Sequence, residues 1–121
     1  MMKRILITIQ LDDVAPRFDL TSEVLIVTLD ADGSATDRKN LVMPSVSAED
    51  LCHFILTEGI DNVICGGIED EYYQYLKWKK VRVIDSVIGP CDRALELAAK
   101  DELNEGAILL DRGKKRKQLN G

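Results

Sequence analysis

The stretch that decides the fold of this chain is NVICGGIE, residues 62–69. It begins as a short apolar run typical of a buried strand, and a helix is predicted to begin at its end. Gly66 and Gly67 lack side chains, so backbone N–H groups at the turn can converge on an anionic guest beside the positive end of the helix dipole. Cys65 adds a candidate soft-metal ligand. The same residues also fit a plain strand-to-helix turn with a buried cysteine, and the stretch by itself leaves both interpretations open.

Upstream of this stretch the sequence predicts three strands. Residues 5–9, ILITI, form a β-branched run suited to a buried central strand, and residues 23–29, EVLIVTL, form a second. Residues 30–34, DADGS, carry a turn signal and predict an antiparallel hairpin with a third strand that ends near Val42.

Helices and strands alternate from there to the end of the domain. Helices are predicted at residues 47–58, 69–79 and 91–102, with a strand at residues 81–84. This alternation implies right-handed parallel crossovers and therefore an α/β fold. Gly89 precedes Pro90 at the start of the last helix, which makes that corner a second candidate anion site.

Composition and charge restrict the partners. The 121 residues predict one domain, residues 1–111, followed by a basic, flexible tail, residues 112–121. The formal net charge is -5, but the tail holds five of the 16 basic residues, so the body has 11 basic against 21 acidic residues. Such a body repels phosphates, which argues against a nucleic-acid partner outside the tail. No apolar stretch approaches the roughly 20 residues that span a bilayer, so no membrane partner is expected.

The cysteines indicate a reduced setting. Cys52, Cys65 and Cys91 are an odd set without CxxC spacing, which argues against a disulfide framework and against a self-contained metal cage. We therefore expect a cytoplasmic protein. A metal centre here would need ligands shared with a partner or with the atoms of the cargo itself.

Two helices carry further side chains that could have a function. His53 falls on the solvent side of its helix, together with Glu49. In the next helix Tyr72 and Tyr75 have core spacing, so we interpret the aromatic cluster that ends at Trp78 as core packing rather than as a base-stacking platform.

Three segments, in this order, resemble the dinitrogenase iron–molybdenum cofactor biosynthesis family: VAPRFD at residues 14–19, EVLIV at 23–27 and GIDNVICGGI at 59–68. The resemblance spans residues 3–103. It implies a three-layer, ribonuclease-H-like α/β fold with a five-stranded mixed sheet in the order 3-2-1-4-5, strand two antiparallel and helices on both faces. Members bind and carry iron–sulfur or iron–molybdenum cluster precursors, or are small proteins of unassigned role. The implied partner is a cluster-assembly or cluster-receiving protein.

The expected binding site lies at one edge of the sheet. In an open α/β sheet ligands bind at the carboxyl ends of strands where the connection direction switches, here between strands one and four. The family resemblance places the binding residues in three loops at this edge: Asp12, Asp13, Arg17, Phe18, Cys65, Gly66, Gly67, Gly89 and Cys91. Cys65 and Cys91 are the expected metal ligands and are both expected to face the crevice. His53 is a further candidate, although it lies within its helix rather than near the helix start, where cluster-binding members tend to carry a histidine.

Three functions remain open at this point. The first is a non-catalytic carrier or insertion accessory for a metal–sulfur cluster precursor, held by the thiolates and by the glycine amides. The second is a metal-independent interaction or small-anion-binding module with the same fold. The third is a carboxylate-dependent metal nuclease, for which Asp12 and Asp13 would need further acids, with Glu69 and Asp70 as candidates. Of these the carrier is the function that we expect, and it is not an enzyme.

Overall fold

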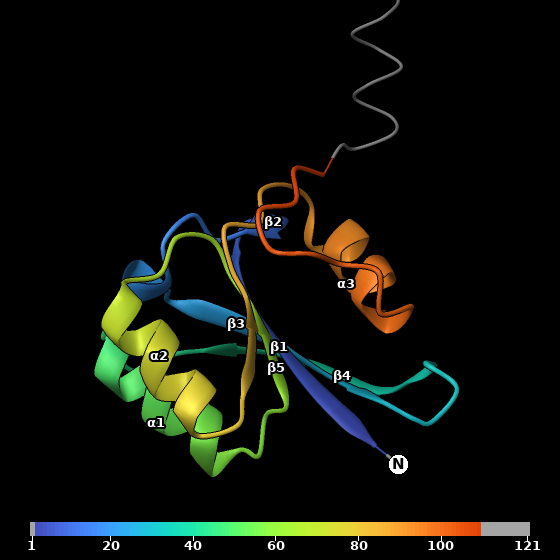
Figure 1. Cartoon of the computed structure of the whole chain (residues 1–121), viewed down its shortest axis with the longest axis horizontal. Coiled ribbons are helices and arrows are strands. Elements are labelled where there is room, and N and C mark those ends of the chain that lie inside the picture. The colour runs from blue at the N-terminus through green and yellow to red at the C-terminus, as the bar shows by residue number, and fades with distance from the viewer. Residues whose placement is uncertain (1, 110–121) are drawn as a thin grey trace, which may run out of the picture.

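The central strand, β1 (Lys3–Gln10), is buried on both of its faces. Ile5, Ile7 and Ile9 belong to one hydrophobic cluster and Leu6 to the other, so alternate side chains of the strand enter two separate cores. Thr8 points to the same face as Leu6, and it is fully buried. The computed structural model describes residues 2–109, and Figure 1 shows β1 in the middle of the sheet.

Five strands follow the expected order. They are β4 (Ala35–Val42), β3 (Glu23–Leu29), β1, β5 (Asn62–Ile64) and β6 (Arg82–Ile84). As predicted, β3 is antiparallel to its neighbours, whereas β5 and β6 run parallel to β1. The predicted number of strands is wrong, however. A sixth strand, β2 (Asp13–Val14), turns back on the end of β1, with Ile9 opposite Val14.

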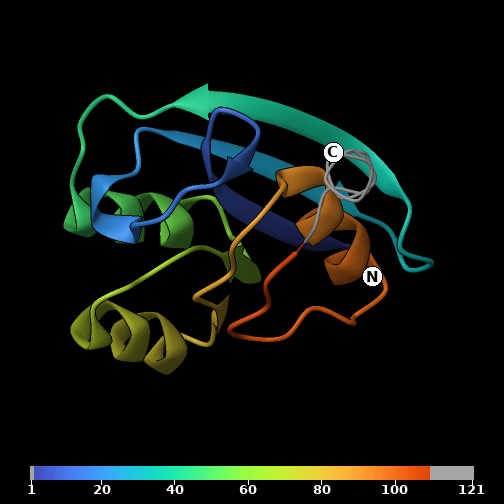
Figure 2. The ribbon, with the colours of Figure 1, turned by 90° about the horizontal axis from the view of Figure 1, so that it is seen from above.

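The helices lie on the two faces of the sheet, as predicted. α1 (Ala48–Thr57) and α2 (Asp70–Trp78) pack on the Leu6 face, and α3 (Cys91–Ala99) packs on the Ile5 face. A short 3-10 helix, η1 (Phe18–Leu20), follows β2. Figure 2 shows β4 at one end of the sheet and α2 at the other. Ser47 caps the start of α1, because its side chain accepts a hydrogen bond of 3.2 Å from the Asp50 amide.

The outer strand β4 is exposed along almost all of its length. One of its edges pairs with β3, and its centre carries the charged residues Asp37, Arg38 and Lys39. Arg38 also forms an ion pair of 3.1 Å with Asp92 of α3. Charged side chains of this kind protect a sheet edge from pairing with another chain.

The last described residues extend the rim of the sheet. Ile108 forms a parallel bridge with Ile88, and the Leu109 amide donates a hydrogen bond of 2.7 Å to the Ile88 carbonyl. The predicted basic tail, residues 112–121, lies outside the described residues. Within residues 2–109, no helix combines the length and the apolar character that a membrane crossing requires.

Candidate functional site

The thiol of Cys65 is sealed in the core. The residue follows β5, is 0% exposed, and belongs to the cluster beneath α1 and α2. Its backbone is fixed on both sides, since its amide donates to the Ile84 carbonyl at 3.1 Å and its carbonyl accepts from the Val87 amide at 3.1 Å. Burial, and then the charge of Asp85, raise the pKa of this thiol far above its ordinary range. The sulfur is therefore protonated at neutral pH and is not presented to a ligand.

The backbone amides of the two glycines after Cys65 are hydrogen-bonded to carbonyl groups of the same chain. The Gly66 amide donates to the Ala15 carbonyl at 3.1 Å, and the Gly67 amide donates to the Pro16 carbonyl at 2.8 Å. The Phe18 amide in turn donates to the Gly67 carbonyl at 2.8 Å. A Cβ atom on Gly66 would lie 2.4 Å from the Ala15 oxygen, so the turn requires glycine there. The two amides that could have bound an anion are thus already satisfied by residues 15–16.

The corner at Gly89 is closed in the same way. Gly89 has φ +128, and a Cβ atom on it would lie 2.6 Å from the Leu109 oxygen. Cys91, at the start of α3, is 6% exposed, and its amide donates to the Asp12 carbonyl at 2.9 Å. Burial, together with the acids Asp13, Asp92 and Asp12, raises the pKa of its thiol to about 12.

The two expected metal ligands do not meet. Cys65 belongs to the core under α1 and α2, whereas Cys91 belongs to the core under α3, on the other face of the sheet. The expectation that both thiols face one crevice is therefore wrong. A cluster or a metal ion held jointly by them does not fit this arrangement, because both sulfurs are buried, protonated and separated by the sheet.

The remaining residues of the predicted site fall into two groups. Asp12 and Asp13 are exposed at the hairpin between β1 and β2, and Arg17 is exposed and pairs with Asp19 at 2.7 Å. Phe18 is a core residue, 1% exposed, whose ring lies 6.4 Å from that of Tyr72. Within residues 2–109 no three His, Cys, Asp or Glu side chains are grouped so that they could hold a metal ion.

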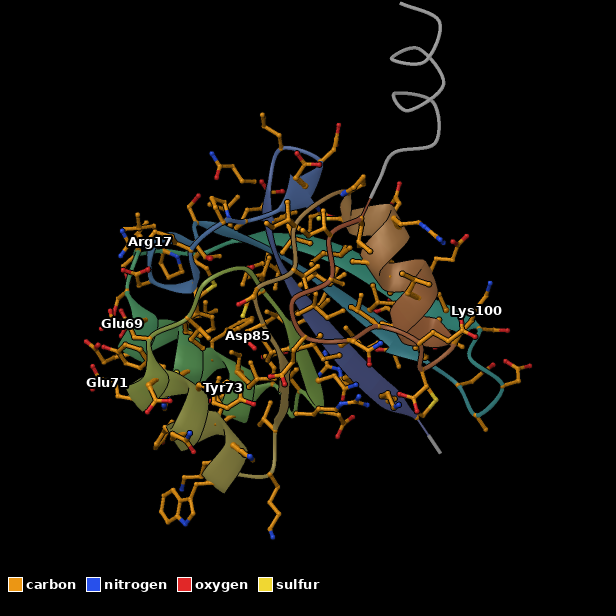
Figure 3. All side chains as sticks on the ribbon, turned by 45° about the horizontal axis from the view of Figure 1, so that its top comes forward. Arg17, Glu69, Glu71, Tyr73, Asp85 and Lys100 are labelled. Atoms are coloured by element: carbon orange, nitrogen blue, oxygen red, sulfur yellow. The ribbon has the colours of Figure 1, made fainter. Side chains whose placement is uncertain are left out.

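An open groove lies elsewhere, between α1 and α2. It has a volume of about 320 Å³ and is lined by Glu49, Cys52, His53, Glu71, Tyr72 and Tyr75. His53 is exposed, as the helical wheel predicted. Glu71 lies on the outer side of α2 (Figure 3). The groove therefore combines aromatic walls with an acidic rim and the only histidine of the chain.

Hydrogen bonding and burial set the chemistry of this groove. The Tyr72 hydroxyl donates to the Glu49 carboxylate and so joins the two helices. That bond, burial and the charge of Glu49 raise the pKa of Tyr72 above its ordinary value. Burial, and then Glu49, raise the pKa of the Cys52 thiol to about 11. The prediction that Tyr75 points inward is wrong, because Tyr75 is 38% exposed and the neighbouring Trp78 is 72% exposed.

Solved structures share this fold at low sequence identity. The crystal structure of PH0822 matches with a TM-score of 0.76 and 19% identity, covering 84% of this chain and 93% of that one. A "putative dinitrogenase" (MJ0327) from Methanocaldococcus jannaschii matches with a TM-score of 0.70 and 22% identity, covering 87% and 95%. A "putative NifB protein" from Thermotoga (TM1290), of the DUF35 family, matches with a TM-score of 0.66 and 16% identity, covering 92% and 99%.

Other comparisons add nothing to these structures. No protein-family model matches the sequence, and no curated protein matches it. At identities below 25% the likeness concerns the fold alone. The chain has the fold of these solved structures, and the resemblance read from its motifs is supported to that extent.

Proposed function

We propose that this chain is a non-catalytic binding protein, related to the accessory proteins of nitrogenase cofactor assembly, that recognises a partner through the groove between α1 and α2. Two structural neighbours, described as a "putative dinitrogenase" and a "putative NifB protein", support the general theme. The choice of the groove rests on the geometry of this chain alone.

The observation that carries the proposal is the closed turn at Cys65. A carrier that used Cys65 and its two glycines would need an accessible thiolate and free amides. Here the thiol is fully buried, and the amides of Gly66 and Gly67 are bonded to the Ala15 and Pro16 carbonyls. Binding is therefore assigned to the groove between α1 and α2, which, among the several open hollows of residues 2–109, combines aromatic walls with an acidic rim.

The groove favours a cationic group with an apolar body. Its rim carries the carboxylates of Glu49 and Glu71, which repel small anions, and its wall carries Tyr72 and Tyr75. A basic or aromatic side chain of a protein partner has this character. This proposal corresponds to the metal-independent interaction module rather than to an anion sensor.

The test uses the benzamidinium ion, a flat aromatic cation, and follows the backbone amide resonances by NMR. We expect shifts that are confined to α1 and α2 and that weaken in Glu49→Gln and in Glu71→Gln. The matched control is Glu96→Gln, which removes a carboxylate from α3, outside the groove. Shifts centred on the hairpin at Asp12, or equal binding by all three variants, would contradict the proposal.

Transient carriage of a metal or cluster precursor is the second candidate, and one observation favours it. Glu49 and His53 are one helical turn apart on α1, and both line the groove. Such a site would depend on ligands brought by the cargo. The test is anaerobic purification from a host that makes iron–sulfur clusters, followed by elemental analysis. Stoichiometric iron that is lost in His53→Ala and kept in Cys65→Ser would establish this candidate, and absence of iron from the wild-type protein would remove it.

A further inference from the structure

One stripe of α2 exposes large aromatic side chains to solvent. Glu71, Tyr75, Trp78 and Lys79 follow one another at spacings of four, three and one residues, which places them on one face of the helix. We call these four residues the α2 ridge. The rings of Tyr75 and Trp78 lie 6.3 Å apart, and Trp78 is 72% exposed. Tryptophan and tyrosine in this position are typical of residues that anchor protein interfaces.

The ridge has opposite charges at its two ends. The first turn of α2 is acidic, with Asp70 and Glu71, and the end of the helix is basic, with Lys77 and then Lys79. The Lys79 ammonium lies 4.7 Å from the Trp78 ring centroid and 5.9 Å from that of Tyr75, so it belongs to the ridge. Lys77 instead lies over Tyr73, on another side of the helix. In Figure 3 Tyr73 is on the side of α2 towards Asp85, whereas Glu71 is on the outer side.

A surface with this order of residues is complementary to itself. If a second α2 helix lies antiparallel to the first with Tyr75 at the centre, residues equally far from Tyr75 lie at the same height along the two helices. Glu71 is then level with the partner's Lys79, within reach of its long side chain, and Tyr72 is level with the partner's Trp78. Twofold symmetry repeats both contacts, because the same patch is used on each subunit.

We propose that a second copy of this chain is the partner that covers the groove, and that the two copies associate through the α2 ridge. The inference rests on the proposed function, since Glu71, Tyr72 and Tyr75 line both the groove and this contact. The partner's Lys79 and Trp78 supply the cationic and aromatic character that the groove favours.

Sedimentation velocity over micromolar to millimolar concentrations tests the association. Glu71→Lys and Lys79→Glu each place like charges opposite one another twice, and we expect each to weaken the dimer about tenfold. The double variant exchanges the two charges and should restore it. Lys77→Glu is the matched control: it makes the same change in net charge as Lys79→Glu on another side of the helix, and it should leave the dimer unchanged.

Trp78 provides a second measurement, because it is the only tryptophan of the chain. As the concentration rises, its emission should shift to the blue and acrylamide should quench it less, whereas in Lys79→Glu both signals should remain those of an exposed ring. A protein that is monomeric at all concentrations, a dimer that leaves Trp78 fully quenchable, or a double variant that stays weak would each overturn the inference. If the protein is monomeric at all concentrations and still binds benzamidinium in the groove, this inference fails alone and the proposed function stands.

Discussion

The turn after β5 is filled by another segment of the chain, whereas the groove between α1 and α2 is open to solvent. The turn has the composition of a ligand cradle, with a thiol and two glycines, yet its amides bind the carbonyls of Ala15 and Pro16. The groove has no motif that marks it, yet it is open and its aromatic walls reach solvent. Glycine at a turn permits another group to approach the backbone closely. That group can be a ligand, but it can equally be another segment of the same chain.

The largest expected effect tests whether the turn is as closed as the structure indicates. In Gly66→Ala the new methyl group would lie 2.4 Å from the Ala15 oxygen and 2.5 Å from the Pro16 oxygen. We expect the free energy of unfolding to fall by about 3 kcal/mol, measured by urea denaturation. Gly67→Ala is the matched control, because its nearest neighbour would be the Pro16 oxygen at an uncrowded 3.5 Å. Equal losses in the two variants would mean that residues 15–16 do not press on the turn.

The pH dependence of the free energy of unfolding tests whether the Cys65 thiol in the closed turn is sealed from solvent. The folded-state pKa of Cys65 is raised by burial, and unfolded thiols titrate near pH ~8.5. The unfolded chain therefore loses its proton first, so the stability from this group is fully present below pH ~8.5 and is lost as the pH rises towards the folded-state pKa. The slope for one thiol approaches about 1.4 kcal/mol per pH unit.

The measurement is urea denaturation at several pH values on the alkaline side of neutrality, with wild type and Cys65→Ala compared at each. The variant should lose stability less steeply, and the difference between the two slopes isolates this thiol from the lysines and tyrosines. Parallel slopes would show that the Cys65 sulfur ionises in the folded protein, as a ligand-binding thiol would.

Two buried threonines should respond with opposite signs. Thr8 is fully buried near the closed turn, and its hydroxyl has no hydrogen-bond partner within the described residues. Thr21 is also buried, but its hydroxyl donates to the Arg17 carbonyl at 3.0 Å. Valine keeps the shape and removes the hydroxyl, so Thr8→Val should stabilise the fold by about 1 kcal/mol and Thr21→Val should destabilise it by about 1 kcal/mol. Thermal denaturation followed by circular dichroism compares them. A loss of stability in Thr8→Val would reveal a partner for the hydroxyl in solution.

The smallest expected effect concerns the groove. Tyr72→Phe removes the hydrogen bond to Glu49 that joins α1 and α2. Because the bond is exposed to solvent, we expect only a small loss in the free energy of unfolding by urea denaturation, smaller than that of Thr21→Val. Freed from that bond, Glu49 should bind benzamidinium at least as tightly as before. A loss of several kcal/mol would instead make the bond an essential part of the fold.

The sheet could be predicted from the sequence because its buried strands are runs of branched apolar residues. The run at residues 5–9 has branched apolar side chains for two cores, and the turn at residues 30–34 fixes the β3–β4 hairpin. Strand β2 was missed, because it has only two residues and follows a turn in which Leu11 takes a positive φ of 59, a conformation that its side chain does not signal.

The site was less predictable, and the reason is geometric. Residue types identify Gly66 and Gly89 as points of close approach, but only the tertiary structure identifies Ala15, Pro16 and Leu109 as the groups that approach. Tyr75 was misplaced for a related reason. Helical spacing gives its position on the wheel, but α2 lies at the end of the sheet and its only buried residue is Leu76.

The contact between Leu109 and Gly89 has a consequence for the order in which the chain folds during synthesis. The Ile88 amide donates to the Ala107 carbonyl, and the Ile88 carbonyl accepts from the Leu109 amide, some twenty residues later along the chain. While the ribosome is still extending the polypeptide, the start of α3 and the Cys91 thiol beneath this rim lack their final cover. The face of the sheet under α3 therefore closes last, when residues 107–109 have emerged and can reach the rim.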